Sequence, residues 1–335
     1  LGGPRAAMLA LCLLAAEPSF MGHRFINPKD IPLAAGYVWS IYYLLRCIGR
    51  FPSLPNGLIV KTGIAFGLTL SFRVGGALVV GYLLLAALFY IARSQGFSAH
   101  PAGRPNRRWV PLAKSLFWIG ALTYALMLAF WPWALVHPLR GPLEALREIS
   151  RFGGWSGPIL LAGKEYYATD LPVFYLPLYF LVKLPELELV GLAVGTALAV
   201  RQLRTRADPV LIRSWVFLVL AMVFPVVYAV LTRAVMYDTH RHFLFVIPLI
   251  CVVAGAAFDR LWAGLYSMRP ALAVGTAAVG VLVAAESATT QVRLHPYEYV
   301  YYNHLVGGVA GAADRYELDY WGMSYREAVG ILVKY

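Results

Sequence analysis

VGGALVVGYLLLAALFYIA, residues 74–92, is the stretch that decides the fold, because it is a continuous apolar run without a charged residue. A run of about 20 such residues crosses the roughly 30 Å hydrocarbon core of a bilayer as an α-helix. Its apolar residues do not alternate with polar ones, as those of a membrane β-barrel strand do. The stretch therefore predicts a transmembrane helix, which satisfies its backbone hydrogen bonds within the segment.

The same pattern recurs along the chain. Of the 335 residues, 60% are hydrophobic and only 14% are charged, whereas a soluble domain carries about 25% charged residues. This predicts an all-α fold, a polytopic transmembrane helical bundle of about nine spans. The spans are expected at residues 6–16 (partial), 31–48, 58–72, 74–92, 114–131, 186–200, 214–232, 243–258 and 271–288. A further apolar stretch, 171–184, is either half of a kinked span or an interfacial helix.

Lys and Arg residues in short loops predict the orientation. The loops richest in them, expected on the cytoplasmic side, are 46–50, 93–114, 201–213 and 260–269. The long loop 132–185 then lies on the outer side. Most acidic residues of the chain also fall in segments predicted to be on that side. The predicted organisation is a transmembrane domain, 1–288, followed by an extracytoplasmic segment, 289–335. The working face is expected to be the outer one.

The formal net charge of +12 raises the question of nucleic-acid binding. The basic residues, however, fall in short clusters between apolar runs and form no continuous basic face with interleaved aromatic residues. We therefore expect no nucleic-acid partner. Anionic headgroups of the lipid bilayer and phosphate-bearing lipid substrates fit this charge better.

The segment HRFINPKDIP, residues 23–32, places His23, Lys29 and Asp30 at the outer mouth of a predicted span. A carboxylate there is able to act as a general base or to hold a divalent cation, and the basic groups suit a phosphate. The alternative is structural, with Asp30 capping the next helix and Pro32 in its first turn.

Arg73 lies between two apolar runs. An arginine near membrane depth is costly and is by default a functional candidate. The alternative is an outer turn from which its guanidinium reaches water.

The segment YDTHRHF, residues 237–243, precedes another predicted span and contains Asp238, His240, Arg241 and His242. Its arginine and histidines predict a cationic site for an oxyanion such as a lipid phosphate. Two histidines and an aspartate also permit metal binding, but no ligand spacing here is specific for a metal. The third alternative is a set of interfacial polar residues that closes a short loop.

Aromatic residues stand beside carboxylates in GKEYYATD, residues 163–170, which contains Glu165, Tyr166 and Tyr167. Flat apolar rings next to hydrogen-bond acceptors suit a sugar or a polyprenyl headgroup. An aromatic belt at the headgroup level explains the tyrosines equally well. The tyrosine-rich tail after residue 294 is expected to be an interface-anchored cap, from which direct chemistry is the less favoured interpretation.

Four motifs together resemble bacterial polytopic glycosyltransferases of the GT-C class, in particular the protein O-mannosyltransferase and lipid A aminoarabinose transferase group. They are HRFINPKDIP at 23–32, RVGG at 73–76, YDTHRHFLFVIP at 237–248, and HPYEYVYYN at 295–303 with ELDYWGMSY at 317–325. The resemblance implies sugar transfer from a polyprenyl-phosphate donor to a hydroxyl of a glycan, lipid or protein, outside the bacterial inner membrane.

In such a reaction an acidic residue deprotonates the acceptor, and cationic groups or a divalent metal (Mg²⁺ or Mn²⁺) stabilise the departing lipid phosphate. The resemblance implies that Asp30 is the acidic residue of the second outer loop, with Lys29 and His23 beside it. Charge and placement favour Arg73 and Arg241 as phosphate contacts. No residue is assigned as a metal ligand.

Members of this class carry an acidic catalytic loop between their first two spans, and that loop would lie before Leu1. We therefore expect a fragment that lacks sequence at both ends and is inactive as it stands. The alternatives are a polytopic transporter or lipid-linked-sugar flippase, which would bury paired charges near the membrane midplane, and an inactive scaffold.

Overall fold

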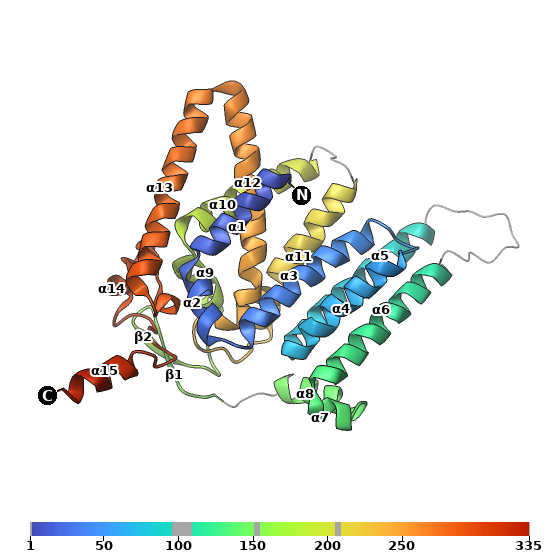
Figure 1. Cartoon of the computed structure of the whole chain (residues 1–335), viewed down its shortest axis with the longest axis horizontal. Helices are drawn as coiled ribbons and strands as arrows, with labels where there is room; N and C mark the ends of the chain where they lie inside the picture. The colour runs from blue at the N-terminus through green and yellow to red at the C-terminus, as the bar shows by residue number, and fades with distance from the viewer. Residues whose placement is uncertain (1, 96–108, 151–154, 205–208, 335) are drawn as a thin grey trace, which may run out of the picture. The chain divides into compact units, whose positions relative to one another are not determined.

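The computed structural model describes residues 2–95, 109–150, 155–204 and 209–334. In these ranges the regular secondary structure is helical apart from one two-stranded hairpin (Figure 1). The expectation of an all-α fold is confirmed at this level. The α-helices are α1 (Pro4–Ala16), α2 (Pro18–Ile26), α3 (Asp30–Ile48), α4 (Asn56–Phe72), α5 (Ala77–Gln95), α6 (Trp109–Phe130), α7 (Pro132–Val136), α8 (Arg140–Ser150), α9 (Tyr175–Lys183), α10 (Glu186–Arg204), α11 (Pro209–Leu231), α12 (Ile247–Met268), α13 (Pro270–Leu294), α14 (Gly308–Ala312) and α15 (Tyr325–Leu332). The 3₁₀ helices are η1 (Val74–Gly76), η2 (Arg241–Val246), η3 (Glu298–Val300) and η4 (His304–Val306), and the strands are β1 (Pro158–Leu161) and β2 (Lys164–Tyr167).

The chain divides into two compact units, which are described separately. The first unit contains residues 1–31, 153–212 and 222–335, and the second contains residues 32–152 and 213–221. The C-terminal segment therefore belongs to the same unit as α1, α2 and α12.

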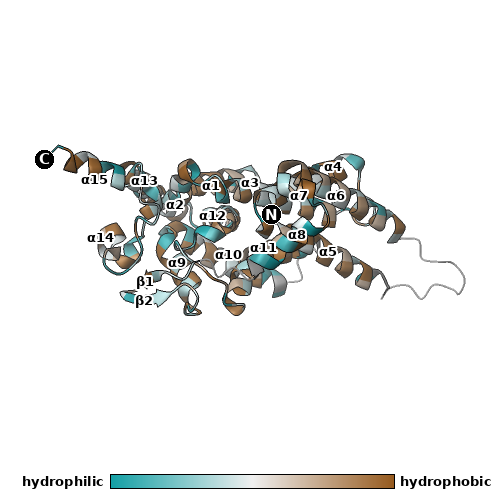
Figure 2. Cartoon of the chain, turned by 90° about the horizontal axis from the view of Figure 1, so that it is seen from below, coloured by the Kyte–Doolittle hydropathy of each residue, from teal (hydrophilic) through white to brown (hydrophobic). Residues whose placement is uncertain are grey.

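Six helical segments of the described chain are long and apolar enough to cross a bilayer, and brown, the hydrophobic colour, is widespread on the helices (Figure 2). They are Asp30–Ile48, Val74–Arg93, Trp109–Phe130, Leu211–Leu231, Arg241–Met268 and Pro270–Leu294. The pair α1 and α2, bent by 67° at its break, makes a seventh if it is one span. These are the helices of a multi-pass membrane protein.

The expected number of about nine spans is not confirmed. The helix α4 has only 17 residues. The helix α10 starts with Glu186 and Glu188 and ends with Arg201 and Arg204, so its apolar part is short. Charged residues at both ends leave a shorter apolar segment of α10 to lie in the hydrocarbon core of a bilayer.

The first unit is built around α12, whose N-terminal half is buried. The helices α1 and α10 pack against it, and α13 runs back beside it (Figure 1). Small residues form these contacts. A Cβ added at Gly255 of α12 would lie 2.6 Å from the backbone nitrogen of Ala10 and 2.7 Å from the carbonyl oxygen of Ala6. Glycine thus lets the backbones approach closely, as in other membrane helix pairs.

The C-terminal segment is interlocked with α2 and α9. A Cβ at Gly22 of α2 would lie 2.3 Å from the backbone nitrogen of Tyr299. The buried Asn303 side chain donates hydrogen bonds to the carbonyl oxygens of Leu181 and Leu184, at 2.7 and 2.8 Å. These bonds satisfy carbonyls at the C-terminal end of α9, which the helix itself leaves without partners.

In the second unit α4 packs along α6 in the same way. A Cβ at Gly63 would come within 3.0 Å of three atoms of Leu122, and one at Gly67 would lie 2.7 Å from the Cβ of Leu126. The two glycines are four residues apart and lie on one face of α4.

We expect Gly255→Ala to lower the free energy of unfolding by about 1–3 kcal/mol, because the new methyl group meets the backbone of α1 and cannot be accommodated by a side-chain rotation. The measurement is thermal unfolding of the purified protein in detergent. Gly280→Ala on α13 is the matched control, since its Cβ would meet no atom within 4 Å, and the expected change is below ~1 kcal/mol. Equal melting temperatures for the two variants would contradict the close α1–α12 packing.

Candidate functional site

The start of α3 is capped by Asn27. Its side-chain oxygen accepts hydrogen bonds from the backbone N–H groups of Lys29 and Asp30, at 3.2 and 2.9 Å. The Asn27 side-chain nitrogen also donates to Oδ2 of Asp30, at 2.7 Å. Asn27 therefore caps this helix, a role that the sequence suggested for Asp30. The Asp30 carboxylate is buried and lies 3.8 Å from the Arg241 guanidinium.

The guanidinium of Arg241 lies between two carboxylates. Its Nη1 is 2.6 Å from Oδ2 of Asp238, and its Nε is 3.8 Å from Oδ2 of Asp30. Its Nη2 donates to Nε2 of His242, at 3.1 Å. The Arg241 side chain is only 13% exposed, so its charge is screened much less than that of a surface arginine. The motifs at residues 23–32 and 237–248 thus meet at one charged group. We call Asp30, Asp238, Arg241 and His242 the Arg241 cluster.

Two aromatic rings pack against the same guanidinium. The carbon Cζ of Arg241 lies 5.2 Å from the ring centre of Tyr237 and 5.0 Å from that of Trp321. Both distances fall within the range of a cation–π contact. Trp321 comes from the C-terminal tail, which was expected to act mainly as a cap, and its sequence motif was singled out only for the family resemblance.

The loop that carries Asp238 has a strained backbone. Asp238 and Thr239 have φ angles of 58° and 66°, in the left-handed region. Threonine is β-branched, so a positive φ is costly for it. Strain of this kind persists where surrounding contacts determine the conformation, and it concentrates at functional sites. Here the hydroxyl of Tyr175 donates to the carbonyl oxygen of Thr239, at 3.3 Å.

His23 is fully buried in α2. Its Nδ1 lies 2.8 Å from the carbonyl oxygen of Ser19, which only accepts hydrogen bonds, so Nδ1 carries the proton. Its Nε2 is then an acceptor, and the hydroxyl of Tyr320 donates to it at 3.0 Å. This geometry defines the tautomer of His23 through its partners, and it brings a second residue of the tail into contact with the predicted motif.

Lys183, at the end of α9, is a buried cation that sequence reasoning missed. It is fully buried, its Nζ donates to the carbonyl oxygen of Tyr299 at 2.9 Å, and it lies 4.2 Å from the ring centre of Tyr302. Burial lowers the pKa of Lys183 to about 7, although the negative charges of Glu17 and Glu317 oppose this shift. Its presence could have been noticed in the sequence, because it is the single lysine of the apolar run 171–184. A charged residue within an apolar run is a functional candidate.

The carboxyl group of Glu317 faces the strained loop. Burial raises its pKa to about 7; the charge of Asp238 adds to the shift, and Lys183 and a hydrogen bond from the Thr239 backbone oppose it. Burial also raises the pKa of Asp238, against the effect of Arg241. The tail and the loop thus share a group of coupled acids.

His240 differs from the cationic residue that the sequence led us to expect. It is fully buried, and neither of its ring nitrogens has a hydrogen-bond partner among the described residues. Burial lowers its pKa well below the ordinary value, and the charge of Lys183 adds to this effect. Its imidazole is therefore neutral at pH 7 and contributes no charge to the Arg241 cluster.

The other predicted residues lie elsewhere. Arg73 belongs to the second unit, where it ends α4, and the side chain of Lys29 is exposed. Glu165, Tyr166 and Tyr167 lie on the strand β2. This strand pairs with β1 in the register Ile159↔Tyr166 and Leu160↔Glu165. Tyr167, at the end of the strand, is 65% exposed. The hairpin and the Arg241 cluster are thus separate features of the first unit.

No group of three or more His, Cys, Asp and Glu side chains in the described ranges has the arrangement of a metal site. The two carboxylates that sequence reasoning offered as cation ligands, Asp30 and Asp238, both face the guanidinium of Arg241. Both carboxylates are therefore engaged with the guanidinium, and a divalent cation stays a prediction from the family resemblance.

No family model matches the chain, and no curated protein matches its sequence. The strongest feature among the side chains of the first unit is the arginine held between Asp30 and Asp238.

We expect Glu317→Gln to change how stability depends on pH. Burial raises the pKa of Glu317 from 4.5 to about 7, so its folded-state proton adds stability that is fully present below pH 4.5 and is lost as the pH rises to about 7. Glutamine cannot titrate, so the melting temperature of the variant should rise relative to wild type over this window. Glu165→Gln on the hairpin is the control. Parallel pH curves for wild type and Glu317→Gln would contradict the buried position of Glu317.

Proposed function

We propose that the protein is a membrane glycosyltransferase. It moves a sugar from a polyprenyl-phosphate donor to an acceptor hydroxyl at the outer face of a bacterial inner membrane. The observation that supports this is the Arg241 guanidinium, buried between two carboxylates and two aromatic rings. The resemblance of the motifs around Asp30, Arg241 and Trp321 to GT-C transferases supports it independently.

A guanidinium in this setting suits the leaving group of such a reaction. When the bond between the sugar carbon and the phosphate oxygen breaks, negative charge grows on the departing polyprenyl phosphate. Nε of Arg241 has no hydrogen-bond partner among the described residues and lies 3.8 Å from the Asp30 carboxylate. Nε–H is therefore able to donate to a phosphate oxygen, and the interaction is stronger in a buried site than in water.

A carboxylate beside the same arginine supplies the base. In the proposed step Asp30 takes the proton of the acceptor hydroxyl, the hydroxyl oxygen forms a bond to the sugar carbon, and the bond from that carbon to the phosphate oxygen breaks. The products are the glycosylated acceptor and polyprenyl phosphate. The acceptor attacks from the side opposite the phosphate, so the configuration at the sugar carbon inverts.

The remaining members of the cluster position the arginine. Asp238 holds Nη1 and His242 accepts from Nη2, which orients the guanidinium before the donor arrives. Preorganised charge of this kind stabilises a developing anion without reorganisation. Further proposed contacts, with the donor or the acceptor, are His23, Lys29, His240, Glu165, Tyr166 and Tyr167. The bundle is proposed to have about nine spans in all.

A transporter or flippase is the second candidate, favoured by one observation. Glu17 is fully buried at the break of the bent pair α1–α2, and it is electrostatically coupled to the buried Lys183. Broken helices with buried charges are typical of transporter substrate sites. Movement of a lipid-linked sugar across vesicles without sugar transfer would favour this candidate, and absence of both activities in the full-length protein would favour an inactive scaffold.

We expect Arg241→Ala to lower sugar transfer by about 10²–10³-fold, the usual effect of removing a donor that stabilises developing negative charge. The assay follows labelled sugar from polyprenyl phosphate to acceptor with purified protein in proteoliposomes. Arg241→Lys should recover only part of the rate, because an ammonium does not reproduce the planar fork that contacts Asp238 and His242.

The control is Arg24→Ala on the exposed face of α2, where the guanidinium contacts only the ring of Phe25 among the described interactions. Its transfer rate should match wild type. Membrane insertion of all three variants is checked by protease protection. Wild-type turnover by inserted Arg241→Ala would remove Arg241 from the site.

We expect Asp30→Asn to abolish turnover while preserving the local fold. The amide is isosteric and still accepts from Asn27, but it is too weak a base to take a proton from a hydroxyl. Asp259→Asn is the matched control, since Asp259 pairs with the exposed Arg5 at 3.1 Å. Retained transfer by Asp30→Asn would show that another group is the base.

A further inference from the structure

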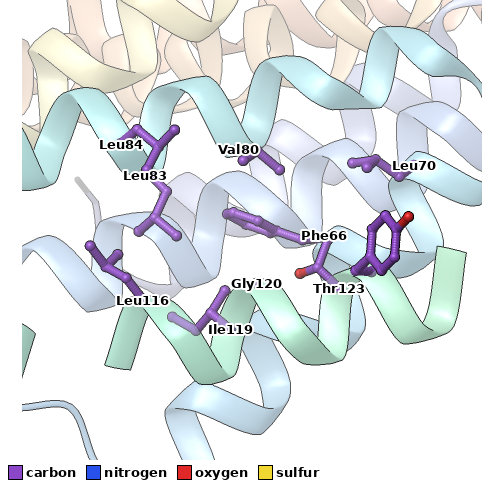
Figure 3. A pocket seen from close by; sticks show the side chains of 10 residues that line it. Phe66, Leu70, Val80, Leu83, Leu84, Leu116, Ile119, Gly120 and Thr123 are labelled. Atoms are coloured by element: carbon purple, nitrogen blue, oxygen red, sulfur yellow. The ribbon is translucent and has the colours of Figure 1, made fainter. Parts of the chain in front are cut away.

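The second unit contains a cavity of about 230 Å³ between α4, α5 and α6. Figure 3 shows side chains from the three helices converging on it, with Leu84 and Leu116 at one end and Leu70 and Thr123 at the other. The buried wall includes Phe66, which is fully buried. Nothing in the proposed transfer reaction uses this cavity.

The lining leaves no polar group for a ligand to bind. The hydroxyl of Thr123 donates to the carbonyl oxygen of Gly63 at 3.4 Å, and that of Tyr124 donates to the carbonyl oxygen of Pro138. All other lining side chains are apolar or absent. An engineered apolar cavity of ~150 Å³ stays dry and binds benzene, so this larger one suits a hydrocarbon and not a polar metabolite.

The cavity opens on the surface of two helices that are candidate spans. Leu84 of α5 is 51% exposed, and Gly120 of α6 is exposed as well. The opening therefore faces the hydrocarbon of the bilayer. From Leu116 to Tyr124 the slot runs about 12 Å along α6, at 1.5 Å per residue. This is within the depth of one leaflet, half of a roughly 30 Å core.

Positive charge lies near one end of the slot. Arg73 follows α4 directly, one helical turn after Leu70. The neighbouring turn η1 contacts α8, an amphipathic helix with exposed leucines. Its arginines, Arg140 and Arg147, are balanced by Glu144 and Glu148, so the net positive charge at this end is that of Arg73. An amphipathic helix of this kind lies in the headgroup region of a membrane. An anionic headgroup would find complementary charge at this end.

We propose that this cavity binds one acyl chain of an anionic phospholipid, with the phosphate of the headgroup at Arg73 and α8. The occupant comes from one leaflet of the surrounding bilayer. It enters sideways between α5 and α6, past Gly120. Its role is to fill the space between α5 and the α4–α6 pair, which would otherwise lack packing contacts.

The test fills the slot from Gly120. A Cβ at this glycine would meet no atom within 4 Å, so Gly120→Leu adds a side chain in the space assigned to the lipid without disturbing the protein. Wild-type protein is purified, exchanged into detergent with dioleoyl phosphatidylglycerol, and examined by native mass spectrometry. We expect retained phosphatidylglycerol in wild type and about tenfold weaker retention in Gly120→Leu.

Gly81→Leu on α5 is the matched control, because a Cβ there also meets no atom within 4 Å and the residue does not line the cavity. It should retain lipid like wild type. Arg73→Ala should weaken retention of phosphatidylglycerol but not of phosphatidylcholine. Leu84→Phe, which narrows the opening from α5, is the second filling variant.

Equal retention by wild type, Gly120→Leu and Gly81→Leu would overturn the proposal. Preferential retention of a polyprenyl phosphate over phosphatidylglycerol would also overturn it, in favour of an isoprenoid site. Sugar transfer is not part of this readout, so the proposal is tested independently of the proposed function.

Discussion

The ion pair between Arg241 and Asp238, with Asp30 on the other side of the guanidinium, is the interaction on which the first unit depends. A buried guanidinium is costly unless its charge is balanced, and removing one partner of such a group leaves the other uncompensated. Asp238 reaches Nη1 at 2.6 Å only because the loop accepts two consecutive left-handed residues. The strained loop, the start of α3 and the tail are thus arranged around one charge.

Burial in this unit also shifts the pKa values of two ionisable side chains toward neutral pH. Lys183 and Glu317 both have pKa values of about 7, the lysine lowered and the glutamate raised by burial. Groups in this range exchange protons readily near neutral pH. The protonation states of Lys183 and Glu317 therefore change with pH near neutrality.

The sequence was sufficient for the fold class and for part of the cluster. Continuous apolar runs predicted α5, α6 and α12 because hydrocarbon permits few alternatives. Charge placement identified Asp30 and Arg241 as candidates, and the structure brings them within 3.8 Å. The role of Asn27 as the cap of α3 was not predicted, because asparagine and aspartate are nearly equivalent at that position.

Other features of the site depend on contacts between distant segments, which residue patterns do not reveal. Trp321 and Tyr320 look like interfacial aromatics in the sequence, yet they contact Arg241 and His23. His240 looked cationic because histidine titrates near pH 7, and its complete burial reversed that interpretation. Burial and long-range contacts are properties of the folded chain.

The position of Trp321 and Tyr320 also has a consequence for biosynthesis. The two partners His23 and Tyr320 are separated by 297 residues of the sequence, so His23 is made well before Tyr320. Contacts of such large sequence separation form late in folding. During translation His23 lacks its hydroxyl partner until the segment that carries Tyr320 has been made and has docked on α2 and α9. Assembly of the first unit thus follows synthesis of this segment, and until then the Arg241 guanidinium lacks its contact with the ring of Trp321.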